Sequence, residues 1–266
     1  MEMDPVSGYD FANWERGYGD LHAVIDPATL RIAAWEEKTA IVLCDLLDPR
    51  THNPVPMSPR QMLRDQLAKA AAMGYTAKGG SEYELTLFDE SFEEAEQKGF
   101  HDLTPSGRYQ EDYHILKGTR HEPIMSRLRH VLDSSAVPVE FTKGEAGFGQ
   151  QELNLKFSEV LEQADRNLLY KHAAKEVAAA QNRSLTFMAK WHHDHTGSSA
   201  HLHLSLWNKG DRTSLFKGNV PFGPVVGSDE FRWFLGGWIS ALRGRAPVCN
   251  GRRYTGAENR SDAAGR

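Results

Sequence analysis

The sequence predicts an α+β fold, in which strands and amphipathic helices follow one another along 266 residues. Three segments alternate polar and apolar residues with the period of a β-strand, and four segments carry apolar residues at helical spacing. The hydrophobic fraction of 40% and the charged fraction of 25% are those of an ordinary globular protein. This composition excludes disordered, collagen-like and coiled-coil proteins.

The first 50 residues contain short apolar runs broken by turn formers. Residues 30–32 and 39–44 are rich enough in apolar and β-branched side chains to predict strands of a small sheet. A group of prolines follows, at Pro49, Pro54, Pro56 and Pro59. Because dense prolines indicate a linker, we place a domain boundary here, with residues 1–55 before it and residues 56–250 after it.

The first helix is expected directly after this linker. Ser58 as an N-cap and Pro59 at the first helical position open it, and Gly74 ends it. Its shared apolar face consists of Leu63, Leu67, Ala70 and Ala71. An alternating strand is then expected over residues 81–88.

A second helix is expected from about Pro123 to just before Pro138, and a second strand over residues 150–157. The apolar stripe of this helix consists of Ile124, Leu128, Val131 and Leu132. Ser158 is then expected to cap a third helix. The apolar residues at helical spacing in that helix are Leu161, Ala164, Leu168 and Leu169.

A third alternating strand is expected over residues 200–207, before a last helix that Ser228 caps. The apolar side of this helix consists of Phe231, Phe234, Leu235, Trp238, Ile239 and Leu242. The segment from Arg243 to Arg266 differs, because it has six arginines and no Leu, Ile, Phe or Met to bury. We interpret residues 251–266 as an off-pattern tail.

The charge balance argues against two classes of binding partner. Thirty-one Lys and Arg stand against 36 Asp and Glu, so no basic excess indicates nucleic acid or an anionic membrane. Neither a membrane span nor a secretory signal is recognisable, and the cytoplasm is the expected location. Cys44 and Cys249 are read as reduced thiols.

The three alternating strands carry polar side chains that point to a site. Glu82 and Glu84 lie two residues apart, so both project from one side of their strand, while Tyr83 and Leu85 face the other. A nearby cation would stabilise two neighbouring carboxylates. The first strand therefore offers a pair of candidate ligands.

The second and third strands add to this group. A glycine-containing turn brings Glu145 near a strand whose Gln150, Glu152 and Asn154 share a face. In the third strand the polar residues are His201, His203 and Ser205, and they alternate with Ala200, Leu202, Leu204 and Leu206. We expect the apolar side of this strand to be core and the polar side to face the site.

Four carboxylates and a histidine form a mostly oxygen ligand set. Such a set suits Mg²⁺ or Mn²⁺ better than Zn²⁺, which prefers sulfur and nitrogen. Hard cations of this kind often accompany phosphates. The candidate ligands are Glu82, Glu84, Glu145, Glu152 and His201.

Each motif also has an ordinary interpretation. The two glutamates suit the solvated face of an antiparallel sheet, and the histidine pair suits a surface or a satisfied core. Residues 147–149 lack the third glycine of a dinucleotide loop and precede a strand, so that class is excluded. A second candidate, for a transition metal, is the cluster His192, His193 and His195 beside Asp194.

The order of the motifs resembles the glutamine synthetase family. Glu-x-Glu comes first, then a glutamate with Gly-x-Gly-Gln-x-Glu, and then Gly-Ser-Ser-x-His-x-His-x-Ser-Leu-Trp. The resemblance runs from about Gly17 to Asn250. Segments that resemble the branch joining glutamate to polyamines or other amines are Tyr83 and residues 102–106, 112–114 and 186–190.

The resemblance implies two metal ions, Mg²⁺ or Mn²⁺. Glu84, Glu145 and Glu152 match the ligands of the first ion. Glu82 and His201 match two ligands of the second. These assignments rest on the matched motifs.

The resemblance also implies roles for four other residues. His203 and Ser205 match positions near the nucleotide, and Gly197 matches a backbone position that binds glutamate. Asp20 matches, by its spacing, a catalytic acidic residue that faces the site of a neighbouring subunit.

The implied architecture is a partial β-grasp domain followed by an incomplete catalytic domain with a curved antiparallel sheet. The implied reaction joins the γ-carboxylate of glutamate to ammonia or an amine, with ATP as co-substrate and a γ-glutamyl phosphate as intermediate. Complete family members form double rings, so a homo-oligomer is implied. Neither nucleic acid nor membrane is an expected partner.

The family's final Glu-x-Arg strand has no counterpart before the tail, so we expect a missing metal ligand and poor turnover. Two other classes therefore stay open. The chain can be an inactive fragment or non-catalytic relative that binds nucleotide or assembles with intact subunits. It can instead be a metal-binding protein that uses the histidines of residues 192–203.

Overall fold

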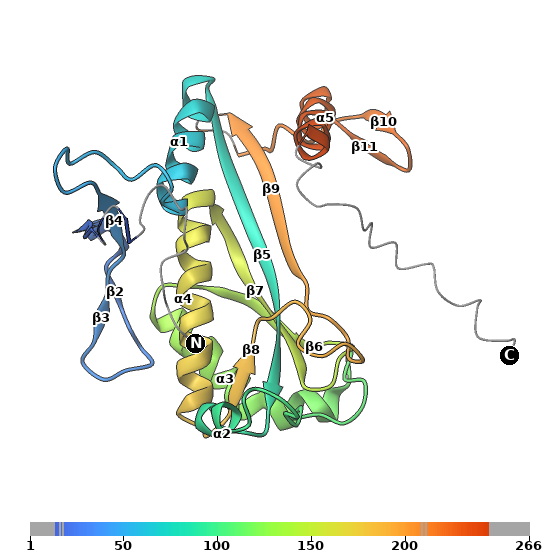
Figure 1. Cartoon of the computed structure of the whole chain (residues 1–266). Coiled ribbons are helices and arrows are strands. Elements are labelled where there is room, and N and C mark those ends of the chain that lie inside the picture. The colour runs from blue at the N-terminus through green and yellow to red at the C-terminus, as the bar shows by residue number, and fades with distance from the viewer. Residues whose placement is uncertain (1–13, 16, 18, 209, 211, 245–266) are drawn as a thin grey trace, which may run out of the picture. The chain divides into compact units, whose positions relative to one another are not determined.

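The computed structural model describes residues 14, 15, 17, 19–208, 210 and 212–244. The chain divides into two compact units, residues 1–210 and residues 211–266 (Figure 1). Helices and antiparallel strands alternate as expected, which confirms the mixed fold class. The domain boundary expected near residue 55 stays a prediction.

Short strands form two small antiparallel sheets before the first helix. β1 (His22–Ile25) pairs with β4 (Cys44–Leu47), and β2 (Arg31–Ile32) pairs with β3 (Ala40–Ile41). A single 3-10 turn, Pro27–Thr29, lies between β1 and β2. The strand expected over residues 39–44 is therefore split between β3 and β4.

Arg60 ties this amino-terminal region to two helices, α1 (Pro59–Ala72) and α4 (Val160–Ala179). Its guanidinium donates two hydrogen bonds of 3.0 Å to Asp165 of α4. It also donates to Asp45 at 2.7 Å and to Asp26 at 2.8 Å. The hydrogen bonds to Asp165 raise the pKa of Arg60 most, so the group stays charged.

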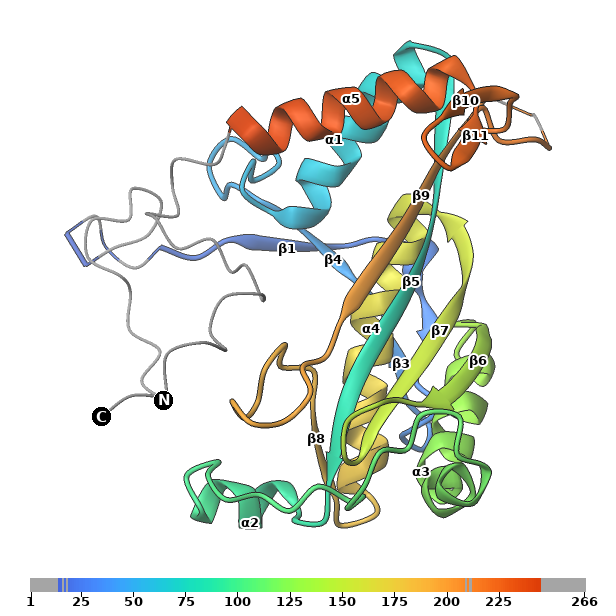
Figure 2. The same cartoon turned by 90° about the vertical axis from the view of Figure 1, so that its right-hand side faces the viewer.

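The main sheet is antiparallel, and its central strand is β5 (Tyr75–Phe88). One edge of β5 pairs with β7 (Gln150–Glu159), which in turn pairs with β6 (Val139–Gly144). The other edge pairs with β9 (Ala200–Asn208) and then, further along, with β8 (Ser184–Thr186). Figure 2 shows β9 and β8 following each other beside β5.

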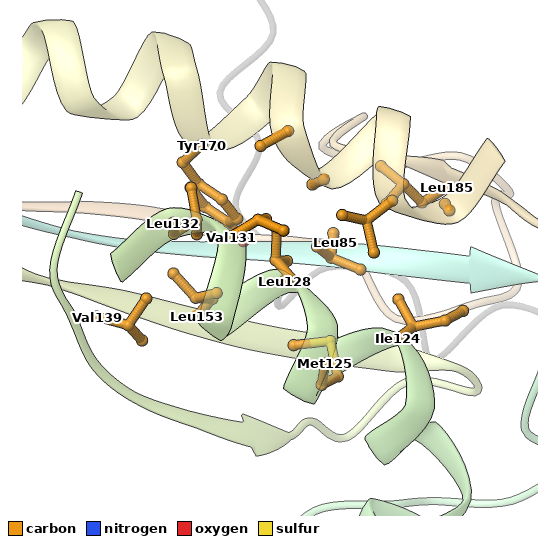
Figure 3. Packing of buried hydrophobic residues seen from close by; sticks show 14 of the residues in the cluster. Leu85, Ile124, Met125, Leu128, Val131, Leu132, Val139, Leu153, Tyr170 and Leu185 are labelled. Atoms are coloured by element: carbon orange, nitrogen blue, oxygen red, sulfur yellow. The ribbon is translucent and has the colours of Figure 1, made fainter. Parts of the chain in front are cut away.

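The hydrophobic core lies between this sheet and the helices α3 (Ile115–Ser134) and α4. The stripe expected on α3 is confirmed, because all four of its residues are buried. Figure 3 shows Leu128 and Leu132 beside Leu85 and Leu153 of the sheet. The short helix α2 (Phe92–Gln97) precedes α3.

The expected start of α3 is wrong. The helix begins at Ile115 and contains Pro123 in its interior. Lys117 and His121 are buried in the turns before this proline. Tertiary packing therefore carries the helix through a residue that usually begins or breaks one.

The expected cap and stripe of α4 are also wrong in part. Ser158 belongs to β7, and Glu159 is the N-cap residue. Leu169 is buried, but Leu168 is 57% exposed. The buried face instead includes polar side chains, such as Gln163, whose amide donates to the hydroxyl of Ser81 at 2.9 Å. An apolar pattern cannot identify such a face.

The apolar side of β9 is not core. Leu202 is 56% exposed and Leu204 is 36% exposed, which contradicts the expectation from their alternation. These leucines are exposed because α4 packs on β5, β7 and β8 and does not cover β9 to the same extent. Among the described residues of this unit, no helix packs on β9 to a similar extent.

The second unit contains the hairpin β10 (Val220–Phe222) and β11 (Val225–Gly227), and the helix α5 (Asp229–Gly244). The hydroxyl of Ser228 accepts a hydrogen bond of 3.0 Å from the backbone N–H of Phe231, which confirms the expected cap. The residues of the expected apolar side that are half-buried are Phe231, Phe234 and Leu235. Its other described members, Trp238 and Ile239, are exposed.

Some expectations fall outside the described residues. They concern the side chain of Leu242, the thiol of Cys249 and the tail over residues 251–266. Cys44 is an exposed free thiol, as expected. Within the described chain, none of the helices combines the length and the apolar character that a membrane span needs.

Candidate metal centre

The register of β5 and β7 sets the polar face of the sheet. Glu84 lies opposite Glu152, and Glu82 lies opposite Asn154. On the other edge of β5, Glu82 lies opposite His201. Tyr83 packs on the opposite, apolar face, with the hydrophobic core. The polar and apolar faces expected for these two strands are therefore confirmed.

Three carboxylates converge on this face. Glu84, Glu145 and Glu152 each offer an oxygen, and these oxygens lie within 4.8 Å of one another. Burial raises the pKa of Glu152, and the neighbouring Glu145 raises it further. Acidic groups gathered at a partly buried place favour a bound cation.

Neighbouring amides orient these carboxylates. The side chain of Gln150 donates to Oε2 of Glu84 at 2.6 Å, and the backbone N–H of Ser199 donates to the same oxygen at 3.0 Å. Asn154 donates to Oε1 of Glu152 at 2.9 Å. The Oδ1 atom of Asn154 is buried and has no hydrogen-bond partner. An all-oxygen set with an unsatisfied amide oxygen nearby fits Mg²⁺ or Mn²⁺.

A second group forms around Glu82. His201 Nδ1 lies 3.2 Å from Oε2 of Glu82, and His203 Nε2 lies 2.8 Å from Oε1. Burial alone would raise the pKa of Glu82, but the two histidines outweigh burial and lower it. The structure brings both histidines to one carboxylate, although only His201 was expected beside Glu82.

A cavity of about 410 Å³ lies next to this second group. Its lining includes Glu82, His203 and Ser205, together with the aromatic residues Phe157 and Trp207. Ser205 accepts a hydrogen bond of 2.9 Å from the indole N–H of Trp207. Sequence reasoning missed Phe157, because an aromatic residue at the end of a strand carries no functional signal by itself.

Gly197 belongs to the first group through its backbone. Its carbonyl accepts a hydrogen bond of 3.0 Å from Gln150, the residue that also holds Glu84. A Cβ atom at this position would lie 2.8 Å from the carbonyl oxygen of Ala189, so glycine is required. Asp20 is exposed before β1 and is in neither of the two groups.

A buried network that sequence reasoning missed supports the turn that carries Glu145. Glu111 is buried and accepts hydrogen bonds of 3.2 Å from the backbone N–H of Gly149 and from the side chain of Gln151. His121 Nδ1 lies 3.2 Å from the same carboxylate. Glu111 lies in a stretch without hydrophobic periodicity, so no sequence signal pointed to it.

The chain matches known proteins in sequence and in fold. A family model described as the catalytic domain of glutamine synthetase matches residues 56–252. The chain is 40% identical over 242 residues to the gamma-glutamylethanolamide synthetase GlnA4 of Streptomyces coelicolor, a match covering 91% of this chain and 51% of that protein. It is 32% identical over 238 residues to a glutamate–isopropylamine ligase of a Pseudomonas species, covering 90% and 51%.

A solved structure titled "Apo GmaS without ligand" has a similar fold. It superimposes with a TM-score of 0.74 at 26% identity, and the match covers 85% of this chain and 51% of that one. The chain thus spans about half the length of the two curated relatives that it matches. The family model nevertheless matches well over half of the chain. The expected resemblance is confirmed, and the chain belongs to the glutamine synthetase family, whose members are ligases.

Proposed function

We propose that this chain is part of an ATP-dependent ligase that joins the γ-carboxylate of glutamate to an amine or to ammonia through a γ-glutamyl phosphate. The convergence of Glu84, Glu145 and Glu152 carries the proposal. These residues lie in the region that matches the family model. The reaction needs fixed negative groups that hold divalent cations against phosphates, and this face provides them.

Glu84, Glu145 and Glu152 would hold one Mg²⁺ or Mn²⁺, and Glu82 and His201 would contribute to a second. When bound, such ions neutralise phosphate charge and align an in-line transfer. Hydrogen bonds from neighbouring amides to Glu84 and Glu152 fix where their oxygens point before any ion arrives. This preorganisation lowers the entropy lost when the substrates bind.

The cavity beside Glu82 is the proposed nucleotide site, with His203 and Ser205 as contacts. Phe157 and Trp207 line this cavity, and a purine base would stack on one of these rings. His203 is exposed, so we expect His203→Ala to weaken ATP binding with little loss of stability. We further propose that the backbone at Gly197 contacts glutamate and that Asp20 serves a neighbouring subunit's site.

The acceptor is proposed to be an amine. The Streptomyces and Pseudomonas relatives are named for ethanolamide formation and for isopropylamine, which favours this branch over ammonia. The small sheets of residues 1–55 are the proposed partial β-grasp domain. A homo-oligomer, with the double ring of complete family members, and a cytoplasmic location complete the proposal.

A second candidate is a non-catalytic protein that binds metal and nucleotide. The carboxylate group and the cavity beside Glu82 are the observations that favour it, because both can bind a ligand without any turnover. A transition state held by several groups loses orders of magnitude in rate when one is absent. If this second candidate is right, the chain binds metal and nucleotide but does not catalyse the ligase reaction.

Calorimetry with Mn²⁺ tests the site first. Glu84→Gln, Glu145→Gln and Glu152→Gln remove charge but keep shape, and each should weaken Mn²⁺ binding. Glu176→Gln, an exposed carboxylate on α4, is the matched control. Unchanged affinity in all three variants contradicts the metal site.

Phosphate release then separates the two functions. The full chain is assayed with ATP, glutamate and a panel of ammonia, ethanolamine, isopropylamine and putrescine. Amine-dependent release that the Glu84→Gln change abolishes supports the ligase. Retained binding of Mn²⁺ and ATP without any release supports the non-catalytic candidate instead.

A further inference from the structure

The loop between β8 and β9 carries a group of side chains that the proposed ligase chemistry does not use. Figure 2 shows this loop leaving the sheet edge between the two strands. His192, His193 and Asp194 each offer a ligand atom, and these atoms lie within 4.8 Å of one another. From these contacts we infer that the loop is a separate site for a divalent transition cation, such as Zn²⁺, Ni²⁺ or Co²⁺.

Two anchors hold the loop in place. The ring of His195 stacks on Trp191 at a centroid distance of 4.7 Å, and Trp191 meets the ring of buried Phe88 edge-on at 4.9 Å. At the base of the loop, the backbone N–H of Ser198 donates to the carbonyl of Ala189 at 2.9 Å. The loop is thus closed at its base and anchored on the core, which reduces the entropy lost when its donors gather around an ion.

The donors themselves are close and open to solvent. The rings of His192 and His193 are stacked with a centroid distance of 5.1 Å. Oδ1 of Asp194 lies 3.0 Å from Nε2 of His193. All three side chains are exposed, so a cation can reach them and complete its coordination with water.

The chemistry of this set differs from that of the carboxylate centre. Two imidazoles and one carboxylate suit zinc and other borderline transition metals, whereas Mg²⁺ and Mn²⁺ prefer oxygen ligands. Glu84, Glu145 and Glu152 supply oxygen alone. The loop and the carboxylate centre should therefore select different metals. Glu82 with His201 and His203 also offers two imidazoles and a carboxylate, so His201→Ala is titrated beside the loop variants and should leave Zn²⁺ binding at the loop unchanged.

The test titrates the full chain with Zn²⁺ by calorimetry, with Mn²⁺ present to fill the carboxylate centre. His192→Ala and His193→Ala should each weaken Zn²⁺ binding about tenfold or more, since even outer partners of a metal ligand change affinity roughly 10–100-fold. The control His101→Ala removes an exposed histidine that is not among the three donors and should leave the affinity unchanged. Mn²⁺ affinity should also be unchanged in the two loop variants.

Co²⁺ provides a second measurement, because its visible absorption reports the ligands directly. The spectrum of the Co²⁺-loaded chain should be lost or altered in His192→Ala and His193→Ala but kept in Glu145→Gln. The proposal is overturned if Zn²⁺ affinity is the same in both loop variants and the unmodified chain. It is equally overturned if Glu145→Gln, rather than the loop variants, removes Zn²⁺ and Co²⁺ binding.

Discussion

The ammonium group of Lys143 forms an ion pair with the carboxylate of Glu145, inside the proposed metal centre. Lys143 also lies opposite Glu152 in the register of β6 and β7. Burial would lower the pKa of Lys143, but the contact with Glu145 outweighs burial and raises it. A permanent positive charge therefore shares these carboxylates with any cation that binds there.

Replacement of Lys143 by Met should strengthen Mn²⁺ binding. The change removes a like charge beside the ion, and we expect an affinity gain of roughly tenfold, given the size of charge interactions near a protein surface. Calorimetry at low ionic strength measures it, with Lys175→Met, an exposed lysine of α4, as the control. Weaker binding in Lys143→Met would show instead that the lysine is needed to hold Glu145 in place.

Glu90 should make stability depend on acid pH. Its carboxylate accepts hydrogen bonds from the backbone N–H of Thr104 at 2.9 Å and from Lys98 at 2.5 Å. Burial would raise the pKa of Glu90, but Lys98 and Thr104 lower it from 4.5 to about 2. A lowered pKa means that the ionised form stabilises the fold above pH 4.5, and that this contribution disappears as the pH falls towards 2.

Denaturant unfolding of Glu90→Gln checks this dependence. The variant should be less stable than the unmodified chain at pH 7, and the difference in free energy of unfolding should shrink between pH 4.5 and pH 2. Glu93→Gln, in the first turn of α2, is the control. A difference that stays constant down to pH 2 would assign the loss to packing rather than to charge.

Truncation of two leucines should distinguish the part of the apolar sheet face that is buried from the part that is exposed. Leu153 is fully buried, so Leu153→Ala should lower the free energy of unfolding by roughly 2–5 kcal/mol. Leu204 is 36% exposed, and Leu204→Ala should lower it by less than about 1 kcal/mol. Urea unfolding compares the two, and an equal loss would mean that Leu204 is covered in solution.

Two glycine substitutions should have opposite effects. A Cβ atom at Gly107 would overlap Oε1 of buried Glu111, so Gly107→Ala must displace a carboxylate that supports the Glu145 turn. At Gly118, inside α3, a Cβ atom meets nothing within 4 Å. Gly118→Ala should therefore raise stability by roughly 0.5–1 kcal/mol, because alanine loses less entropy in a helix.

Thermal unfolding measures both changes. Gly107→Ala should lower the melting temperature strongly and weaken Mn²⁺ binding as well, since Gly149, a hydrogen-bond partner of Glu111, follows Glu145 in the same turn. A Gly107→Ala chain that keeps both its stability and its Mn²⁺ affinity would show that the network does not support the metal centre.

The sequence was sufficient for the polar faces of the strands, because alternation fixes which side chains share a face. Glu82 and Glu84 on β5, and Glu152 on β7, therefore lie as expected. Alternation gives the side of a residue but not what covers that side. Leu202 and Leu204 were for this reason wrongly expected in the core.

Other features depend on residues that are far apart in the chain. The Glu111 network joins a loop residue to His121 of α3 and to Gly149 before β7, and none of these positions shows a local pattern. The buried face of α4 contains Gln163 and Asp165, which a search for apolar periodicity passes over. Convergence of this kind becomes visible when the strands are paired and the helices are packed.

β8 and β9 both pair with β5, and this arrangement determines which part of the chain can vary between relatives. β8 and β9 each have their own anchoring ladder on the same strand, so the 187–199 connection leaves the sheet between two independently fixed ends. Its length and chemistry can change without shifting either ladder. Exchange of residues 190–196 between relatives should therefore transfer the properties of the loop, while Gly197 and Ser199 keep the contacts that hold Gln150 and Glu84.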